Sequence, residues 1–499
     1  MERMNTRCYL NRVFTAFVAL FLVASMGGCS FLKPLYKRPE LPVSGHYPSN
    51  TGEIAATGLE ATATGWRDYF IDKKLCFLIE QALKNNRDLR IAVYRVEEAR
   101  AQYGIRRADQ FPTINAGADW VRQQTPKDLS LSGKRQISNQ YEVNLNSVAW
   151  EVDFWGRVRN LKDAALENYL ATDAARQAVA ISLIANVADS YLRLCEFDER
   201  IILTMKTIET REEGLRIFKR RFEEGSISRL DVEEVETLLK EAQALGAQLQ
   251  QERAIEVNFL IFLIGSPVDL GSSQGSLSDF DALPALRAGL PSELLNNRPD
   301  IMAAEHQLVA ANANIGAARA AFFPRVTLTG DVGTASAQFA GLFAPESLAW
   351  MYGPTISMPI FDAGRTRNNL NLAEARSNVA VAQYERTIQA AFREVADALS
   401  SQKWLIEQVR IQQETLAVQL ERSRLAKLRY DRGKAAFLEV LDAERNKLST
   451  EQKLLQARRA LLSSRVNLYA TLGGGSQTNA IRQAAIEDLM ENLNQRKGK

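Results

Sequence analysis

The feature that most limits how this chain can fold is an internal repeat. The stretch 429–444 matches 221–236, so that Gly433 lies 208 positions after Gly225. In both stretches a helical pattern ends before the glycine and another begins after it, which predicts a helix–turn–helix corner. The matched pairs are Arg221 with Arg429, Phe222 with Tyr430, Leu230 with Leu438, Asp231 with Glu439, Val232 with Val440 and Glu236 with Glu444. We therefore expect one architecture built twice.

A second part of the repeat precedes each corner, at an offset of 212. Residues 88–112 match residues 300–324, including the dipeptide Phe-Pro at the end of each. Proline cannot continue a helix and biases the residue before it towards extended backbone. Pro112 and Pro324 therefore mark the two junctions where a helix gives way to a strand.

The positions of the fourteen prolines leave room for very long helices. No proline lies between Pro126 and Pro267, and none follows Pro359. Apolar residues recur there at spacings of three and four, the pattern of a coiled-coil seam. The predicted helices are 88–110, 158–222, 230–264, 300–322, 365–430 and 438–472. Two of the shorter helices, stacked end to end, have nearly the length of one long helix. This predicts a wall of antiparallel helices.

Alternating patterns predict four strands, at 113–122, 140–152, 325–335 and 350–361. Apolar residues alternate with polar ones, which suits a half-buried soluble sheet and equally a membrane barrel with lipid outside and water inside. Lengths near ten residues and aromatics towards the strand ends favour the barrel. Four strands cannot close one, because the smallest membrane barrels need about eight. The barrel must be shared between subunits, with connecting loops at 123–139 and 336–346.

The first residues read as a secretory leader that ends in a lipidation signal. Basic residues precede a short apolar run, followed by Met26-Gly-Gly-Cys29-Ser30. Cys29 is therefore the predicted site of acylation. After it, the chain has no apolar stretch of 18 residues, so further membrane contact must come from strands. The expected segments are a lipoprotein signal peptide at 1–28, a lipid-anchored N-terminal tether and equatorial segment at 29–85, a first repeat at 86–265, a linker at 266–299, a second repeat at 300–473 and a polar C-terminal tail at 474–499.

Charge and composition exclude several functions. A net charge of +3, from 62 basic and 59 acidic residues, gives no field of the kind that nucleic acid binding needs. The two histidines, His46 and His306, lie far apart with no acidic or thiol cluster around them. The sequence therefore predicts no metal site, no cofactor and no catalytic constellation. Cys76 and Cys195 read as small buried residues, with a disulfide between them left open.

Together these segments resemble the outer membrane factor family of TolC- and OprM-type exit ducts, in its lipoprotein (NodT-type) branch. The resemblance covers nearly the whole chain after the leader. It is carried by Cys29 with Pro34, Tyr36, Arg38 and Pro39; by Trp66, Phe70, Asp72, Leu75 and 82–89; by Phe111-Pro112 and Phe323-Pro324; by 150–157 and its repeat 361–365; and by 430–433 and 439–443.

The resemblance implies an α+β membrane protein. Three copies would form a 12-stranded outer-membrane barrel, four strands per chain, continuous with a long periplasmic α-helical barrel. The implied partners are two further copies of the chain, outer-membrane lipid, a periplasmic adaptor and an inner-membrane pump, most simply of RND type, that expels drugs or other small toxic compounds.

The corners carry the candidate site. Glu439 and Asp442 are three apart on a helix, so their carboxylates share one face, and acidic rings of this kind select cations. The resemblance makes these residues, with Asp231, the constricting ring of a periplasmic gate. It also implies a hydrogen bond from Tyr430 to Asp231. The family has aspartate more often at position 439, and a solvated acidic helix face is the simpler interpretation.

Two other functions remain open from sequence. One is an outer-membrane duct for type I protein secretion, against which the lipidation signal argues. The other is a periplasmic coiled-coil adaptor or scaffold lipoprotein, which would share the helices and the anchor but not the four alternating strands.

Overall fold

The computed structural model describes residues 32–47, 58–270, 276–280 and 282–478. The predicted leader, the acylation site Cys29 and the tail beyond residue 478 lie outside these residues. The chain divides into two compact units. Unit 1 consists of the described parts of Met1–Pro39, Glu97–Ala171 and Ala304–Tyr384, and unit 2 consists of those of Glu40–Val96, Thr172–Ala303 and Glu385–Lys499.

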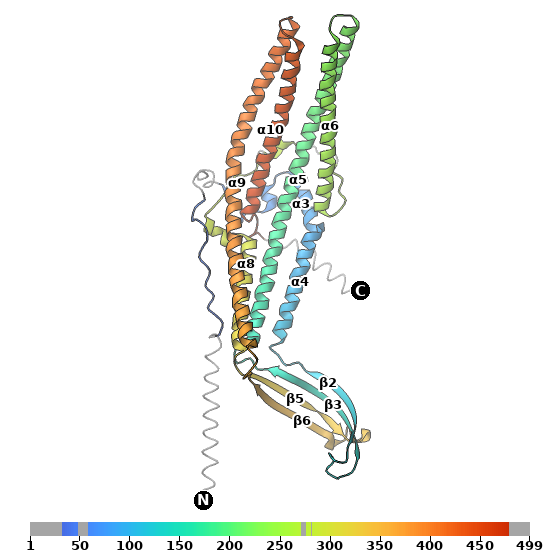
Figure 1. Cartoon of the computed structure of the whole chain (residues 1–499), viewed down its shortest axis with the longest axis vertical. Coiled ribbons are helices and arrows are strands. Elements are labelled where there is room, and N and C mark those ends of the chain that lie inside the picture. The colour runs from blue at the N-terminus through green and yellow to red at the C-terminus, as the bar shows by residue number, and fades with distance from the viewer. Residues whose placement is uncertain (1–31, 48–57, 271–275, 281, 479–499) are drawn as a thin grey trace. The chain divides into compact units, whose positions relative to one another are not determined.

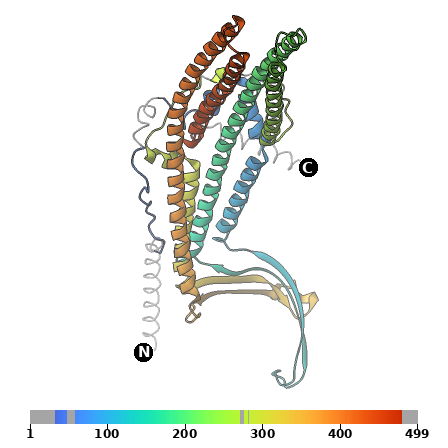
Figure 2. The same ribbon diagram turned by 45° about the horizontal axis from the view of Figure 1, so that its top comes forward.

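Unit 1 contains a four-stranded antiparallel sheet in the order β2-β3-β5-β6 (Figures 1 and 2). Its strands are β2 (Asn115–Thr125), β3 (Gln136–Glu151), β5 (Arg325–Ser336) and β6 (Leu348–Ser357). The predicted fourth strand is wrong at its end: β6 stops at Ser357, because Ser357 pairs with Arg325, the first residue of the partner strand β5. The first hairpin extends beyond the prediction, to Thr125 and back from Gln136, and shortens the loop between them.

The two faces of this sheet differ in polarity. Residues directly opposite each other on neighbouring strands share a face. One row crosses three strands as Leu145, Val332 and Trp350, and the next row along pairs Asn146 with Asp331. The sheet thus has an apolar and a polar face, and β2 and β6 are its two edges.

Six helices of more than twenty residues lie in the described part of the chain, and each begins and ends within two residues of its prediction. They are α4 (Arg87–Ala108), α5 (Arg157–Glu223), α6 (Arg229–Ile264), α8 (Pro299–Ala320), α9 (Arg365–Asp431) and α10 (Phe437–Thr471). One prediction needs correction: α5 does contain an 18-residue window apolar enough to cross a membrane. Because 61% of that window is buried inside the protein, α5 is a packed core helix.

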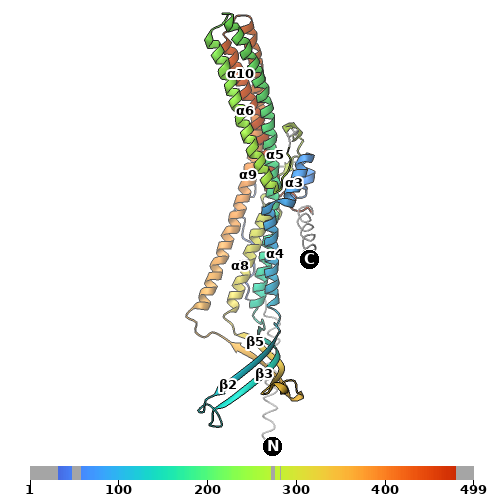
Figure 3. The same cartoon turned by 90° about the vertical axis from the view of Figure 1, so that its right-hand side faces the viewer.

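In unit 2 the C-terminal part of α5 forms a hairpin with α6, and that of α9 forms a hairpin with α10 (Figures 1 and 3). The two hairpins lie side by side with their corners at the same end. They correspond to the two sequence repeats. The N-terminal segment and the linker contribute small elements to the same unit: β1 (Leu59–Glu60), paired in parallel with β4 (Leu286–Arg287), and the helices α2 (Trp66–Tyr69), α3 (Lys73–Asn85) and α7 (Leu294–Asn297).

A stacked tyrosine pair fixes part of these elements to α10. The rings of Tyr69 and Tyr469 lie 4.5 Å apart at a 9° angle, and both side chains are almost fully buried. Each hydroxyl donates to a backbone carbonyl, Tyr69 to Arg465 at 3.1 Å and Tyr469 to Thr64 at 2.9 Å. Burial raises the pKa of both phenols. In the same unit no disulfide links Cys76 to Cys195, and the Cys76 thiol donates to the Phe70 carbonyl.

Candidate functional site

The two corners have the same backbone geometry. α5 ends at Glu223 and α9 at Asp431, and each corner contains a glycine with positive φ, 75° at Gly225 and 65° at Gly433. The Ser226 amide donates to Arg221, and the Lys434 amide donates to Arg429, both at 2.9 Å. A Cβ at either glycine would meet no atom within 4 Å. Glycine is therefore favoured at these corners by backbone conformation, not by lack of space.

The first corner uses Asp231 to start a helix. Ser228 and Asp231 form a capping box at the N-terminus of α6: the Asp231 amide donates to Ser228 Oγ at 3.2 Å, and the Ser228 amide donates to Asp231 Oδ2 at 2.9 Å. The second corner has Ala436 in the position of Ser228 and no side-chain cap. Glu439, which matches Asp231 in the repeat, is therefore available for another contact.

Both acidic residues of the second corner are paired with arginines of the same hairpin. Glu439 Oε2 lies 2.9 Å from Arg429 Nη1. Asp442 accepts from Arg422 and, at 3.0 Å, from Arg445. The hydrogen bond from Arg422 holds the pKa of the Asp442 carboxyl below its ordinary value. The acidic face predicted from sequence is thus present, and its charge is balanced locally.

The hydrogen bond expected between Tyr430 and Asp231 is wrong for the single chain. Tyr430 Oη instead accepts from Arg221 Nη1 at 3.2 Å, while the Asp231 carboxylate faces Ser228. The reason is local: Asp231 completes a helix cap, and a carboxylate so placed satisfies amides that the first turn leaves without partners. Arg221 thus provides a polar contact between the hairpins.

An aromatic contact that the sequence analysis did not identify also joins the hairpins. Phe437, the first residue of α10, lies with its ring 4.2 Å from that of Phe218 on α5 and 4.9 Å from that of Tyr430. It packs against a buried core that the first hairpin forms with Leu441 of α10. The buried members of that core are Leu215, Phe218, Val232, Val235, Leu238, Leu239 and Leu441.

A comparison of the two repeats could have pointed to this contact. At the offset of 208, Phe218 matches Ala426 and Phe437 matches Arg229. Each phenylalanine therefore stands where the other repeat has no aromatic residue. Where each repeat has an aromatic residue that the other lacks, the two side chains can pack against each other between the hairpins.

Beside this contact lies a groove of about 610 Å³ between α6 and α10. Four carboxylates and two guanidinium groups line it, together with Thr237 and apolar residues such as Leu438. The charged residues are Glu234, Glu241, Glu439, Asp442, Arg422 and Arg445. Glu439 and Asp442 thus contribute both to the arginine pairs and to the wall of this groove.

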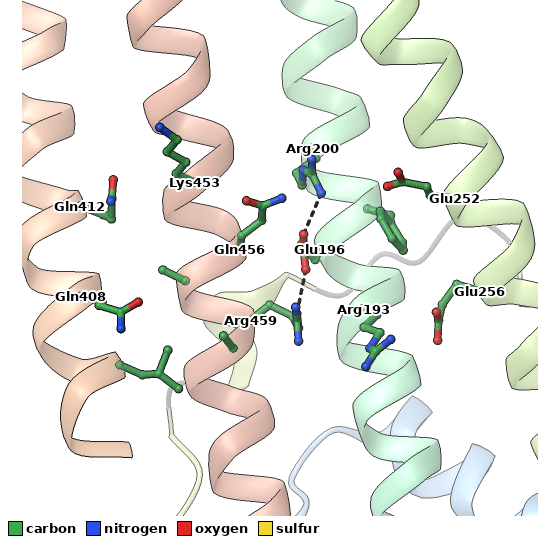
Figure 4. Close-up of a pocket in the computed structure, with 14 residues that line it drawn as sticks. Arg193, Glu196, Arg200, Glu252, Glu256, Gln408, Gln412, Lys453, Gln456 and Arg459 are labelled. Carbon is green, nitrogen blue, oxygen red and sulfur yellow. Dashed lines mark hydrogen bonds and ion pairs between the residues drawn. The ribbon is translucent and has the colours of Figure 1, made fainter. Parts of the chain in front are cut away.

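A second polar site lies further from the corners on the same helices (Figure 4). Glu196 of α5, with a side chain only 5% exposed, accepts from Arg200 at 2.9 Å and from Arg459 of α10 at 2.8 Å. Arg200 also donates to Gln452 of α10 at 2.5 Å. One buried carboxylate thus links the two repeats, beside a cavity of about 610 Å³ that Gln408, Gln412 and Lys453 also line.

Neither polar site has the composition of a catalytic or metal centre. Among the described residues, no three His, Cys, Asp or Glu side chains converge in a way that could hold a metal ion. Glu439, Asp442 and Glu196 are paired with arginines, and Asp231 caps a helix. The two sites instead hold the two hairpins together through side-chain contacts.

Comparison with known proteins identifies the family. The model of the family described as "Outer membrane efflux protein" matches residues 78–266 and 290–474, the two repeats. The chain belongs to this family. It is 43% identical over 460 residues to the solvent efflux pump outer membrane protein SrpC of Pseudomonas putida, covering 91% of this chain and 97% of that protein. It is 40% identical over 487 residues to the antibiotic efflux pump outer membrane protein ArpC of the same species, covering 97% and 99%.

A solved structure shares the fold of this outer membrane efflux protein. The crystal structure of a membrane protein from Pseudomonas aeruginosa superposes with a TM-score of 0.83 at 39% identity, covering 89% of this chain and all of that one. The outer membrane channel MtrE of Neisseria gonorrhoeae also shares it, with a TM-score of 0.79 at 37% identity, covering 89% of this chain and 98% of that one. Long helices with four strands per chain are therefore the fold of an outer-membrane channel. The chain is an outer-membrane component of an efflux pump and not an enzyme.

Proposed function

We propose that three copies of this chain form the exit duct of a tripartite pump that carries organic solvents and antibiotics out of the cell. The relatives SrpC and ArpC are named for solvent and antibiotic efflux, which supports this choice of cargo. The other components would be a periplasmic adaptor and an inner-membrane pump of RND type. A passive duct requires no cofactor, and its selectivity would lie largely in the pump.

The assembly is supported by the sheet of unit 1. Four strands are too few for a membrane barrel, whereas three copies would supply twelve. The edges β2 and β6 would pair between neighbouring subunits, with the apolar row of Leu145, Val332 and Trp350 facing lipid. Acylation of Cys29 would add a lipid anchor to each chain.

The corners would form the closable periplasmic end. The observation that carries this proposal is that the two hairpins meet there through the ring of Phe437, the Arg221–Tyr430 hydrogen bond and the apolar core that Leu441 joins, whereas the acidic face is paired within one hairpin. Asp231, Tyr430, Glu439 and Asp442 remain our candidates for control of passage, joined now by Phe218 and Phe437. Gly225 and Gly433 would set the turns.

The function can be tested in cells. Deleting the gene should sensitise the host to toluene and to antibiotics, and the intact gene should restore resistance only when the pump and adaptor are present. Unchanged sensitivity, together with loss of a secreted protein, would instead favour a protein-secretion duct. Trimers extracted from the outer-membrane fraction would exclude a monomeric periplasmic adaptor.

A further inference from the structure

The N-terminal strap, residues 33–38, is fastened to helix α8 within unit 1. Arg38 donates to Glu305 through Nε at 2.8 Å and Nη2 at 2.6 Å, and the Tyr36 hydroxyl donates to the same carboxylate at 3.0 Å. A bidentate arginine–carboxylate pair is among the stronger polar contacts in proteins. The Glu305 side chain is only 17% exposed, so the pair is partly shielded from water. We name the contacts of Glu305 with Tyr36 and Arg38 the strap clamp.

Two further contacts fix the direction of the strap. Asn312 Nδ2 donates to the Pro34 carbonyl at 2.8 Å, and Lys33 lies 3.9 Å from Asp163 of α5. The strap therefore passes Asn312 first and Glu305 afterwards, antiparallel to α8. Seven helical residues rise about 10 Å. Two to four extended residues cover about 6–13 Å, so an extended strap matches the spacing of these contacts.

The buried surroundings of the clamp fit a permanent contact. Tyr384 of α9 is fully buried beside the clamp, and its pKa is raised by burial and by the Glu305 carboxylate. Burial also raises the pKa of Tyr36, and the hydrogen bond to Glu305 raises it further. Tyr36 therefore remains a hydrogen-bond donor at every physiological pH.

The docked strap limits how far Cys29 can reach. Pro34 comes five positions after Cys29, and a fully extended chain spans at most about 17 Å over that length. Along α8, the eight residues from Asn312 to Ala320 rise about 12 Å, and β5 begins five residues later. Cys29 can thus reach the level at which α8 ends and β5 begins, and little beyond it.

We propose that the strap is a spacer that sets where the lipid anchor enters the bilayer: Glu305 holds residues 33–38 on α8, so that acyl chains on Cys29 are confined to the helix-to-strand junction. The inference rests on the proposed acylation of Cys29. Its partner is the lipid of the leaflet next to that junction. Glu305 is a positioning residue in this scheme, acting through Arg38 and Tyr36.

Spin labelling tests the clamp directly. Leu35 is 95% exposed, so a nitroxide on Leu35→Cys can be accommodated, in a background with Cys76→Ala and Cys195→Ala. In lipid vesicles the label should show the restricted motion of an exposed side chain on an ordered backbone, and Glu305→Ala should lower the ratio of restricted to mobile signal at least tenfold. Glu374→Ala removes a matched surface carboxylate of unit 1, paired with Arg319, and should change nothing. Equal mobility with and without Glu305 would overturn the clamp.

A deletion tests the spacer length. Removing Ser30 and Phe31 shortens the reach by about 7 Å, so that an acylated chain must pull the strap from α8. The label should become mobile in this variant, and become restricted again when Cys29→Ser is combined with the deletion behind a non-lipoprotein leader. A strap that stays docked in the acylated deletion variant would refute the spacer. Mass spectrometry of the N-terminal peptide reports acylation separately, so a missing lipid would be recognised as failure of the anchor and not of the clamp.

Discussion

Truncating Phe437 should weaken the contact between the two hairpins more than removing the hydroxyl of Tyr430. Phe437 makes one ring contact with the other hairpin, to Phe218, and one within its own hairpin, to Tyr430; an aromatic pair contributes about 0.5–1.5 kcal/mol beyond area burial. Tyr430→Phe keeps its ring against Phe437 and loses one exposed hydrogen bond, worth about 1 kcal/mol or less. Asp231→Ala would act elsewhere, by removing the carboxylate half of the α6 capping box, while Ser228 still accepts from the amide of residue 231.

The free energy lost in each chain adds up in the assembled channel. If opening separates Phe437 from Phe218 in all three subunits, a loss of about 1 kcal/mol in each gives about 3 kcal/mol for the trimer. At about 1.4 kcal/mol per tenfold change, the ratio of closed to open channels falls roughly 100-fold for Phe437→Ala. Phe437→Leu, which keeps an apolar side chain, should fall between this variant and the wild type.

Single-channel recording in planar bilayers measures this ratio. A double-mutant cycle with Phe218→Leu and Phe437→Leu then isolates the coupling between the rings, expected at about 0.5–1.5 kcal/mol per chain. The apolar contact would be rejected as a closing element if Phe437→Ala conducted like the wild type, or if Tyr430→Phe opened the channel further than Phe437→Ala.

Four other predictions follow from the same helices. Arg422→Gln leaves Asp442 with one guanidinium partner in place of two and should increase cation preference, seen as a shift in reversal potential under a salt gradient. Conductance should not change between pH 8 and 5 through titration of Asp442. Because the folded protein holds the pKa of Asp442 below its ordinary value of 3.8, the carboxylate stays ionised and paired with its arginines above that pH. The pairs are lost only when the pH falls through the lowered pKa. Gly433→Ala should lower the free energy of unfolding by about 1–2 kcal/mol through backbone strain alone, because the added methyl meets no atom, and calorimetry can measure the loss. Glu196→Gln removes the charged partner of the buried Arg200 and the half-buried Arg459 and should destabilise the protein by about 3 kcal/mol, visible as a lower melting temperature; an unchanged melting temperature would show that the network is dispensable.

The long helices could be predicted because proline is absent where they run and apolar spacing marks one face. The arginine pairs of the second corner could also have been found. Arg429 and Glu439 lie almost equally far on either side of Gly433, and antiparallel helices bring such positions together. Contacts within one hairpin can therefore be predicted by pairing residues that lie at similar distances in sequence on either side of the turn.

Contacts between hairpins could not be recovered in this way. Phe218 and Phe437 lie more than 200 residues apart, and only the packing of two repeats decides which of their faces meet. The same limit explains the missed pairing of Leu59 with Leu286 and the stack of Tyr69 on Tyr469. The end of β6 also depended on a partner distant in sequence, because Ser357 pairs with the first residue of β5, Arg325.

The open edges of the four-stranded sheet restrict how this protein can enter a membrane. A lone chain would carry about 20 backbone groups without partners along β2 and β6 into hydrocarbon, each costing several kcal/mol. Insertion of a single subunit is therefore prohibitively unfavourable, whereas a closed ring has no such penalty. Association must accompany or precede insertion, so the rate of channel formation should depend steeply on subunit concentration, and a subunit without partners should stay at the membrane surface, held there only by the acyl chains proposed on Cys29.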